Sequence, residues 1–303
     1  MSVEAIPKPV RAFLKRIPGV LPTWQFVRYA LPHRIWRRCH AGDLRIVEGL
    51  PLFTPSSGGD IAARAALTFE SANLTVPLLA RLARPCHGFT HIEPLALGSV
   101  ASEPAAAAAA AELEALFVTR RSDKSTVHDY HHLYGALLRR RAEVTKVLEI
   151  GIGTNNEDVV SNMSRDGTPG ASLRAFRDFL PNARIFGADL DARVLFQEDR
   201  IATFAVDQTN QSSLERLGSQ VGDDFDLIID DGLHAPHANL SVLLFAMPRV
   251  KPGGHIVIED IPRVAAPLWQ VVGAIMPVEF ECSLFDSRSA LLFVARRRPA
   301  ANA

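Results

Sequence analysis

The sequence has little cysteine and no excess of charge of either sign. Only Cys39, Cys86 and Cys282 are present among 303 residues, and lysine plus arginine number 33, as do aspartate plus glutamate. Cysteines so far apart exclude a disulfide framework and a zinc-binding spacing. A formal net charge of zero argues against a protein that binds nucleic acid or an anionic membrane through a broadly charged surface.

Long apolar runs are also missing. No stretch reaches the roughly 18 residues that a membrane-spanning helix needs, and the N-terminal residues lack the apolar core of about 7–15 residues that marks a secretory signal. We therefore expect a soluble, cytoplasmic protein without stable membrane insertion. Hydrophobic residues make up 48% of the sequence, which is typical of a globular core, and the length favours about two domains.

Positive charge is concentrated in residues 1–40, which hold eight lysines and arginines and one acidic residue. Trp24, Phe26, Tyr29 and Trp36 lie among these charges. One interpretation is a basic amphipathic surface for membrane or nucleic acid. The other, which we favour, is a helical arm whose aromatic side chains pack on its own fold or on a sister subunit.

Residues 41–120 carry a mixed pattern. The apolar stretch 44–53 predicts a strand, and residues 61–84 are helical at intervals. Seven alanines at 105–111 follow Pro104, which predicts one helix that begins at the proline. We therefore expect residues 1–120 to form a mainly helical N-terminal domain.

A regular alternation begins near residue 145. Short apolar, β-branched segments predict strands at 146–151, 184–189, 201–206, 225–230 and 255–259. Helical segments at 172–180, 212–221 and 239–250 separate several of them, and residues 278–284 and 291–295 predict a terminal antiparallel hairpin. This order indicates an α/β fold with a doubly wound, mostly parallel, seven-stranded sheet over residues 121–297, followed by a tail at 298–303.

In an open parallel sheet, ligands bind beyond the carboxyl ends of the strands. The first strand ends in LEIGIGT, where Gly151 and Gly153 permit a tight turn and close approach of a ligand to the backbone. Asn156 stands where a dinucleotide fingerprint has its third glycine, so a dinucleotide is disfavoured. Glu149 is unusual inside a strand end, because a buried carboxylate needs a partner, which a cationic or hydroxyl-rich ligand would supply.

Acidic and amide side chains follow the next two strands. Asp189 is placed to accept hydrogen bonds from both hydroxyls of a ribose. Asp191 can assist, although an acid at the start of a helix also has a purely structural explanation. Asp207 and Gln208 follow the third strand, where they can contact an adenine edge.

Four carboxylates follow the fourth and fifth strands, namely Asp230, Asp231, Glu259 and Asp260. Carboxylates crowded at one edge repel one another unless a cation compensates, and oxygen ligands favour Mg²⁺. Helix capping with salt bridges to basic residues is the structural alternative. His234 lies in the loop after Asp231, where a histidine beside a metal can act as general base; His237 is the fallback, which we expect to be a surface residue.

These motifs, in this order, resemble class I S-adenosylmethionine-dependent methyltransferases over residues 120–297. VLEIGIG is similar to their first motif, FGADLD to their ribose-binding motif, and FDLIIDDGLH with KPGGHIVIEDI to their fourth and fifth strands. More narrowly, the sequence resembles the Mg²⁺-dependent sugar O-methyltransferases of macrolide biosynthesis. The segment RSDKSTVHDY, which ends at Tyr130, is similar to one that helps those enzymes close the cofactor pocket.

The resemblance implies a Rossmann-like fold, S-adenosylmethionine and Mg²⁺ as cofactors, and O-methylation of a sugar-like natural product. It makes Asp231, Glu259 and Asp260 the metal ligands and His234 the base. Alignment by strand ends to catechol O-methyltransferase would choose Asp230 as ligand instead of Asp231; we rank Asp231 first and place Asp230 with the cofactor. The resemblance also implies that residues 1–120 cover the acceptor site and make contacts in a homo-oligomer.

Three other functions are compatible with such a sheet. A short-chain dehydrogenase needs a Tyr-x-x-x-Lys pair beyond the fourth strand, but Tyr29, Tyr130 and Tyr134 are the only tyrosines and all precede the first strand. A metal-independent methyltransferase acting on nitrogen or carbon would use the same cofactor without the acidic cluster. A non-catalytic oligomeric scaffold would bind no cofactor at all.

Overall fold

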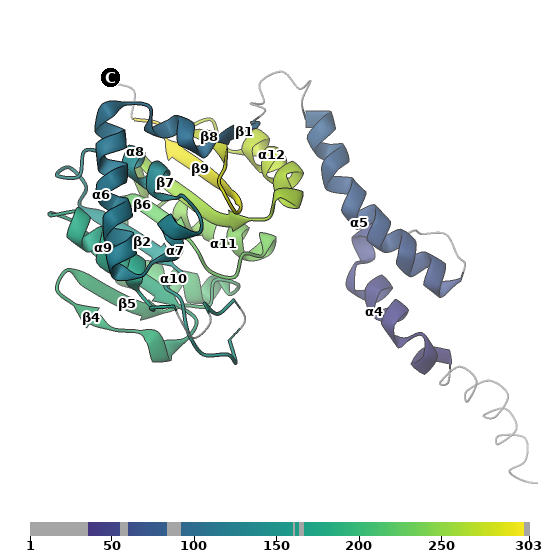
Figure 1. Ribbon diagram of the computed structural model, residues 1–303. Coiled ribbons are helices and arrows are strands. Elements are labelled where there is room, and N and C mark those ends of the chain that lie inside the picture. The colour runs from purple at the N-terminus through teal and green to yellow at the C-terminus, as the bar shows by residue number, and fades with distance from the viewer. Residues whose placement is uncertain (1–35, 55–59, 84–91, 160, 164–166, 300–303) are drawn as a thin grey trace, which may run out of the picture. The chain divides into compact units, whose positions relative to one another are not determined.

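A computed structural model describes residues 36–54, 60–83, 92–159, 161–163 and 167–299 (Figure 1). Contacts divide the chain into two units, Met1–Leu78 and Leu79–Ala303, and each is described here by itself. The predicted basic arm lies outside the described residues except for residues 36–40. The boundary between the units falls earlier than residue 120, where the sequence pattern had placed it.

The first unit contains helix α4 (Ala41–Gly49), a short 3₁₀ helix (Pro51–Phe53) and most of helix α5 (Ile61–Ala83). The strand predicted at 44–53 is wrong. Leu44, Val47 and Leu50 recur at a spacing of three residues, which suits a helical face as well as a strand. The prediction of helix over 61–84 is confirmed, and α5 continues through Pro77.

The second unit contains one large sheet and its covering helices (Figure 1). Its strands are β1 (Pro94–Ala96), β2 (Lys146–Ile150), β3 (Arg184–Asp189), β4 (Gln197–Glu198), β5 (Ile201–Ala205), β6 (Phe225–Asp230), β7 (Val250–Ile261), β8 (Phe280–Asp286) and β9 (Leu291–Arg297). Its α-helices are α6 (Pro104–Arg120), α7 (Asp123–Thr126), α8 (His131–Leu137), α9 (Ala171–Phe179), α10 (Gln211–Val221), α11 (Pro236–Ala246) and α12 (Ala266–Ile275).

The sheet has the order β1-β8-β9-β7-β6-β2-β3-β5-β4. Strands β2, β3, β5, β6 and β7 are parallel, while β9 runs antiparallel to both β7 and β8. The predicted count of seven strands is wrong, because two short strands extend the edges: β1 pairs with β8 and β4 pairs with β5. The seven predicted strands form the contiguous middle of this sheet, and the predicted doubly wound α/β class with its terminal hairpin is observed.

Side chains of the central strands alternate between two hydrophobic layers, as a period of two requires. Leu148 and Ile228 face the layer covered by α10, α11 and α12. Val147 and Leu227 face the opposite layer, covered by α6, α8 and α9. The sheet is therefore buried on both faces, and its polar chemistry is restricted to the strand ends.

Helix α6 begins at Pro104, as predicted, and several of its alanines pack against neighbouring elements. Ala106, Ala110, Leu113 and Phe117 are buried at helical spacing. The helix packs against α8 and α9, so it belongs to the second unit. This placement explains why the boundary between the units precedes it.

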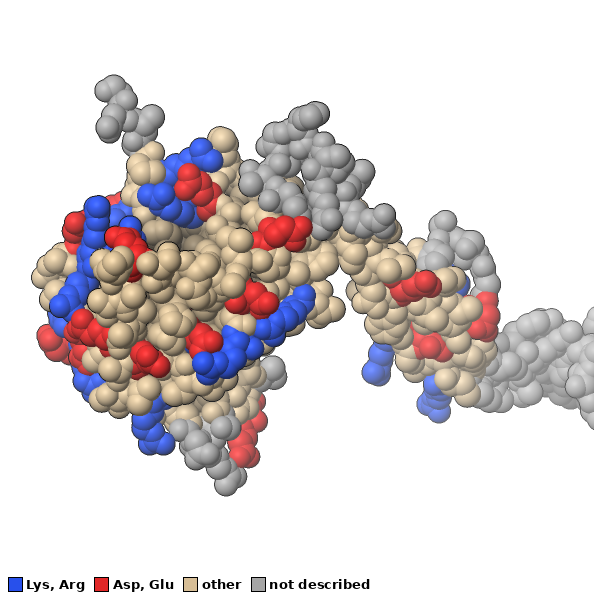
Figure 2. All heavy atoms as spheres, turned by 45° about the horizontal axis from the view of Figure 1, so that its top comes forward, with Lys and Arg blue, Asp and Glu red and all other residues tan. Residues whose placement is uncertain are grey.

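Basic and acidic side chains are interspersed on the face of the second unit that Figure 2 shows. Neither sign forms a broad continuous patch on that face. Within the described residues, no helix combines the length and apolar composition needed to cross a membrane.

Candidate functional site

Two neighbouring pockets lie at the carboxyl edge of the parallel strands. The first is lined by the ends of β2, β3, β5 and β6. The second is lined by the turn after β2, by α7, by the start of α9, by the loop after β6 and by Asp260 near the end of β7. Both lie where β2 separates β3 from β6, the switch point at which such sheets bind ligands. Gly151, Gly153, Ser161 and Asp231 line both pockets.

Gly151 and Gly153, which line both pockets, stand at positions where the backbone favours glycine. Their φ angles are +91° and +83°, in the region that side chains disfavour. A Cβ atom on Gly151 would lie 2.1 Å from the carbonyl oxygen of Asp231. The glycines predicted from the first motif therefore let the turn after β2 pass directly beneath the loop after β6.

Asp189 and Asp191 differ in orientation although they are two residues apart. Asp189 lines the first pocket, and its two oxygens accept hydrogen bonds from the backbone N–H groups of Ile152 (2.9 Å) and Asp191 (2.9 Å). Burial raises the pKa of Asp189. Asp191 instead bonds Thr154 and Arg193, and the Arg193 bond holds its pKa below the usual range. Asp189 thus faces the first pocket, whereas Asp191 is held by side chains outside its lining.

Asp207 and Gln208 both line the first pocket. The Gln208 side chain also joins two loops, since its Nε2 donates to Asp230 (3.1 Å) and its Oε1 accepts from the Leu233 backbone (2.9 Å). Gln208 therefore presents part of its amide to the pocket while fixing the loop after β6.

The adjacent acids Asp230 and Asp231 point in different directions. Asp230 is fully buried and accepts hydrogen bonds from Asn239 (2.9 Å) and Gln208. Burial raises the pKa of Asp230 to about 6 despite these bonds. Asp231 lines both pockets. Of the two acids between which the sequence leaves the choice of metal ligand open, Asp231 is the one that lines the pockets.

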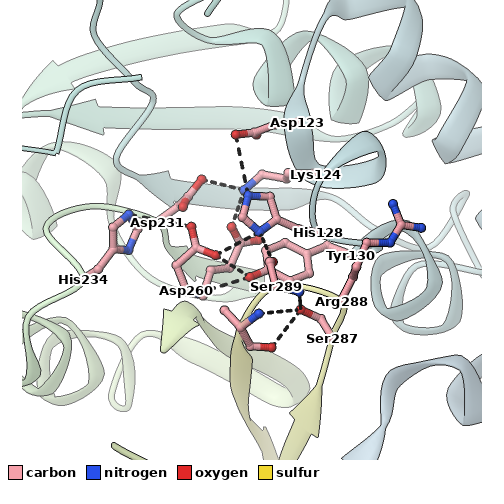
Figure 3. Close-up of polar contacts among 12 residues, drawn as sticks. Asp123, Lys124, His128, Tyr130, Asp231, His234, Asp260, Ser287, Arg288 and Ser289 are labelled. Atoms are coloured by element: carbon pink, nitrogen blue, oxygen red, sulfur yellow. Dashed lines mark hydrogen bonds and ion pairs between the residues drawn. The ribbon is translucent and has the colours of Figure 1, made fainter. Parts of the chain in front are cut away.

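Asp231, His234 and Asp260 form a candidate metal centre (Figure 3). One possible ligand atom from each lies within 4.8 Å of the others. His234 and Asp260 have φ angles of +56° and +53°, and such strain in non-glycine residues is concentrated at functional sites. His237 is exposed at the start of α11, as expected for a surface residue.

Glu149 and Glu259 are buried beneath this centre, with Lys124 between them. Glu149 accepts a hydrogen bond from Ser172 (2.7 Å), and its second oxygen lies 3.1 Å from the Lys124 Nζ. Glu259 accepts from Lys124 with one oxygen and from Tyr134 with the other. The partner expected for Glu149 was a ligand; the structure supplies a lysine of the chain itself.

Lys124 was not identified from the sequence as a site residue. Its Nζ also donates to Asp231 Oδ2 (2.7 Å), so it contacts three carboxylates. Although burial alone would lower it, the charges of these carboxylates raise the pKa of Lys124 well above its usual value. The only signal was its place in the RSDKSTVHDY segment, which does not say which strand ends it reaches.

Asp260 is held by two aromatic side chains from the segment before α8. The Tyr130 hydroxyl donates to Asp260 Oδ1 (2.5 Å), and His128 Nδ1 lies 3.2 Å from the same oxygen. Tyr130 was predicted to contact the cofactor; the structure places it against Asp260 and outside the lining of both pockets. His128 also contacts Ser289 (2.6 Å), so the β8–β9 hairpin supports the same acid.

Comparisons with known proteins place this geometry in context. No family model matches the chain. The chain is 30% identical over 161 residues to the 8-demethyl-8-alpha-L-rhamnosyl tetracenomycin-C 2'-O-methyltransferase of Streptomyces olivaceus, an alignment that covers 52% of this chain and 40% of the relative. It is 35% identical over 122 residues to the mycinamicin VI 2''-O-methyltransferase of Micromonospora griseorubida, covering 40% of this chain and 28% of the relative. The chain thus spans less than half the length of these relatives.

Solved structures show the same fold. The MycE methyltransferase of the mycinamycin pathway, in complex with Mg and SAH, superposes with a TM-score of 0.51 at 23% identity, covering 63% of this chain and 55% of that one. A complex that also contains mycinamycin VI gives a TM-score of 0.50 with the same coverage. The resemblance to sugar O-methyltransferases that the motifs indicate is confirmed by these relatives, and the fold is that of a methyltransferase.

Proposed function

We propose that the protein is an S-adenosylmethionine- and Mg²⁺-dependent O-methyltransferase that acts on a hydroxyl of a sugar-bearing small molecule. The observation that carries the proposal is the meeting of Asp231, His234 and Asp260 where the two pockets adjoin. The names of the relatives supply the acceptor class, since they act on rhamnosylated or macrolide substrates.

The first pocket is assigned to the adenosine part of the cofactor. Asp189 faces this pocket, and each of its oxygens accepts one backbone hydrogen bond, which leaves lone pairs for ribose hydroxyls. Asp207 and Gln208 line the same pocket and are assigned to the adenine edge. Gly151 and Gly153 lead from this pocket to the second one, where the acceptor is assigned.

The donor set of the candidate metal centre fits a hard cation, because Asp231 and Asp260 present carboxylate oxygens at short range. Bound Mg²⁺ would make a coordinated hydroxyl more acidic, and bound S-adenosylmethionine would supply a methyl group on a good leaving group. Glu259 stays a predicted third ligand. Its two oxygens accept hydrogen bonds from Lys124 and Tyr134, so a metal would share one of these oxygens with its present partner.

His234 is assigned as the general base that takes the proton from the acceptor hydroxyl. Among the described residues its Nδ1 has no hydrogen-bond partner, and its Nε2 lies 3.8 Å from Asp260 Oδ2. A carboxylate beside an imidazole stabilises the imidazolium that forms on proton transfer. The His234 side chain lines the second pocket, where a proton would be released.

The charge of the cluster supports the same assignment. Asp231 and Asp260 line the second pocket, and Glu149 and Glu259 lie buried beneath them, where burial raises the pKa of both glutamates. Lys124 contacts three of these four acids. Carboxylates that face a pocket attract cations such as a divalent metal or a sulfonium.

The test is methyl transfer from labelled S-adenosylmethionine to mycinamicin VI, to demethylmacrocin and to rhamnosylated tetracenomycin, with Mg²⁺ or with EDTA. We expect transfer to at least one glycosylated acceptor, with EDTA abolishing it. Transfer that persists in EDTA would favour a metal-independent methyltransferase. Calorimetry with S-adenosylhomocysteine that shows no binding would favour a non-catalytic scaffold.

We further propose that part of residues 1–120 makes subunit contacts in a homo-oligomer. Leu67, Leu74 and Leu78 lie at positions i, i+7 and i+11 of α5 and are about half exposed. Apolar side chains aligned on a helix face are typical of contact surfaces. Light scattering of Leu74→Glu should give a smaller mass than the unaltered protein, and an equal mass would contradict the assignment.

A further inference from the structure

Lys124 occupies an unusual position for a lysine. Its side chain is 2% exposed, and its Nζ lies within 3.1 Å of Glu149, Asp231 and Glu259, which come from β2, the loop after β6 and β7. Figure 3 shows it beside Asp231. An ammonium carries three protons, so one group can serve three carboxylates that arrive from three different strand ends.

The choice of lysine at this position is itself informative. The chain has five lysines among 33 basic residues, the rest being arginines. A guanidinium presents its protons in a flat fork, whereas an ammonium is a compact point charge with three diverging donors. Three carboxylates that converge on one point are therefore better served by a lysine, although this chain has few lysines.

We propose that Lys124 is the resident counter-ion of the acidic cluster. It holds Glu149, Asp231 and Glu259 together without a metal, and its charge limits the affinity of the neighbouring centre for a divalent ion. The proposal rests on the proposed function only for the position of that ion, not for methyl transfer.

Two consequences follow from Coulomb's law. Without Lys124, the buried carboxylates repel one another at short range, and a divalent ion is the obvious remaining source of positive charge. With Lys124 present, a metal at Asp231 and Asp260 has an ammonium as its neighbour, because Lys124 contacts Asp231 directly. Removing the lysine should therefore make folding depend on metal and should tighten metal binding.

The experiment compares Lys124→Met with Lys251→Met, a matched control whose lysine is partly exposed and pairs with Asp226. Thermal unfolding is followed in EDTA and in Mn²⁺, and Mn²⁺ affinity is measured by electron paramagnetic resonance. In EDTA we expect the Tm of Lys124→Met to fall by about 10 °C and Mn²⁺ to restore most of it. We expect Mn²⁺ affinity to rise at least about tenfold, with neither change in Lys251→Met.

Two further variants test the shape and the charge of the Lys124 side chain. Lys124→Arg should not restore unaltered behaviour, because the flat fork of a guanidinium cannot serve three carboxylates that converge on one point. If Lys124→Met does not fold, the double variant Lys124→Met/Glu149→Gln, which removes one of the opposing charges, should fold again.

An unchanged or weaker Mn²⁺ affinity in Lys124→Met would overturn the proposal, as would a double variant that also fails to fold. These readouts need no turnover. If methyl transfer is never found but melting of Lys124→Met depends on metal, the proposed function fails and the role of Lys124 stands. If methyl transfer is found but melting of Lys124→Met does not depend on metal, the role of Lys124 fails and the proposed function stands.

Discussion

The two edges of the central sheet differ in how their charged side chains are paired and buried. At the carboxyl edge, one buried lysine is shared by three carboxylates, and a fourth, Asp260, lies beside them. At the amino edge, a pocket is lined by several cations, among them Arg139, Lys251 and Arg296. Each of these three has an acidic partner of its own near the surface, namely Glu103, Asp226 and Glu281.

The difference teaches how to recognise the working edge of such a sheet. An exposed ion pair contributes little to stability because water already solvates both charges. A buried cluster costs desolvation energy that only close partners offset, and here it stands beside two pockets. Convergence with burial, rather than the number of charges, separates the candidate site from the opposite edge.

His234→Ala gives the largest effect that we expect at the carboxyl edge. Loss of a general base should lower turnover by ~10²–10⁴-fold, while S-adenosylhomocysteine binding, measured by calorimetry, stays the same. His237→Ala is the control, since that residue is exposed at the start of α11, three positions after His234. Equal turnover in the two variants would contradict the assignment of His234 as the base. The carboxyl edge would then no longer be distinguished by a general base.

Asp230 makes the carboxyl edge less stable as pH rises. Its pKa in the folded protein is about 6 against an ordinary 3.8, so the folded state binds a proton more tightly than the unfolded chain. The contribution to stability is complete below pH 4 and is lost as pH rises through 6, which amounts to about 3 kcal/mol. Asp230→Asn should remove that loss, measured as the free energy of unfolding in urea from pH 4 to 7.

His255 acts with the opposite sign at the amino edge. Burial, aided by Arg296 and Arg139, lowers the pKa of His255 to about 4 from 6.5. Stability is present above pH 6.5 and is lost as pH falls through 4, by roughly 3 kcal/mol. In the same urea series, His255→Gln should remove this loss. The free energy of unfolding should therefore change with pH in opposite directions in the Asp230→Asn and His255→Gln variants. Parallel profiles would show that the two edges do not differ in their pH dependence.

Tyr130→Phe tests the support of the metal centre. The variant keeps the ring but deletes the hydrogen bond to Asp260, and loss of such a partner to a ligand lowers metal affinity by ~10–100-fold. Mn²⁺ titration measures it, with His255→Gln from the amino edge as control. An unchanged affinity would show that Asp260 does not depend on Tyr130 to hold a metal.

Lys251→Met should have the smallest effect. Its lysine is 34% exposed and pairs with one acid, Asp226, so the free energy of unfolding should fall by less than about 1 kcal/mol. Chemical denaturation measures the change. A loss as large as that in Lys124→Met would erase the contrast between the edges.

Local pattern predicted the strands of the sheet well and its edges poorly. Strands β3 and β6 begin and end at the predicted residues, because continuous apolar runs mark buried strands. Strands β1 and β4 have three and two residues, too few to show any periodicity. The false strand at 44–53 had the apolar content of a strand, but its spacing also fits the helix that forms.

The site was predictable where topology alone determines position. Asp189, Asp231 and Asp260 lie at or just beyond the carboxyl ends of parallel strands, so their position at one edge of the sheet follows from the fold. Lys124 and Tyr134 precede the first long strand and reach Glu259 across 135 and 125 positions of sequence. No local pattern encodes such contacts, because packing of α6 and α8 on the sheet sets where that segment ends.

The two short edge strands have a consequence for how copies of the protein can associate. A strand of two or three residues exposes few unpaired N–H and C=O groups, so it is a poor template for another chain to extend the sheet. Strand β1 covers the outer side of β8 only at Leu284–Asp286, and β4 covers that of β5 only at Ile201 and Ala202. In the described part of the chain, another copy could therefore extend this sheet only along the few uncovered residues of β8 and β5, so side-chain surfaces offer the larger area for association.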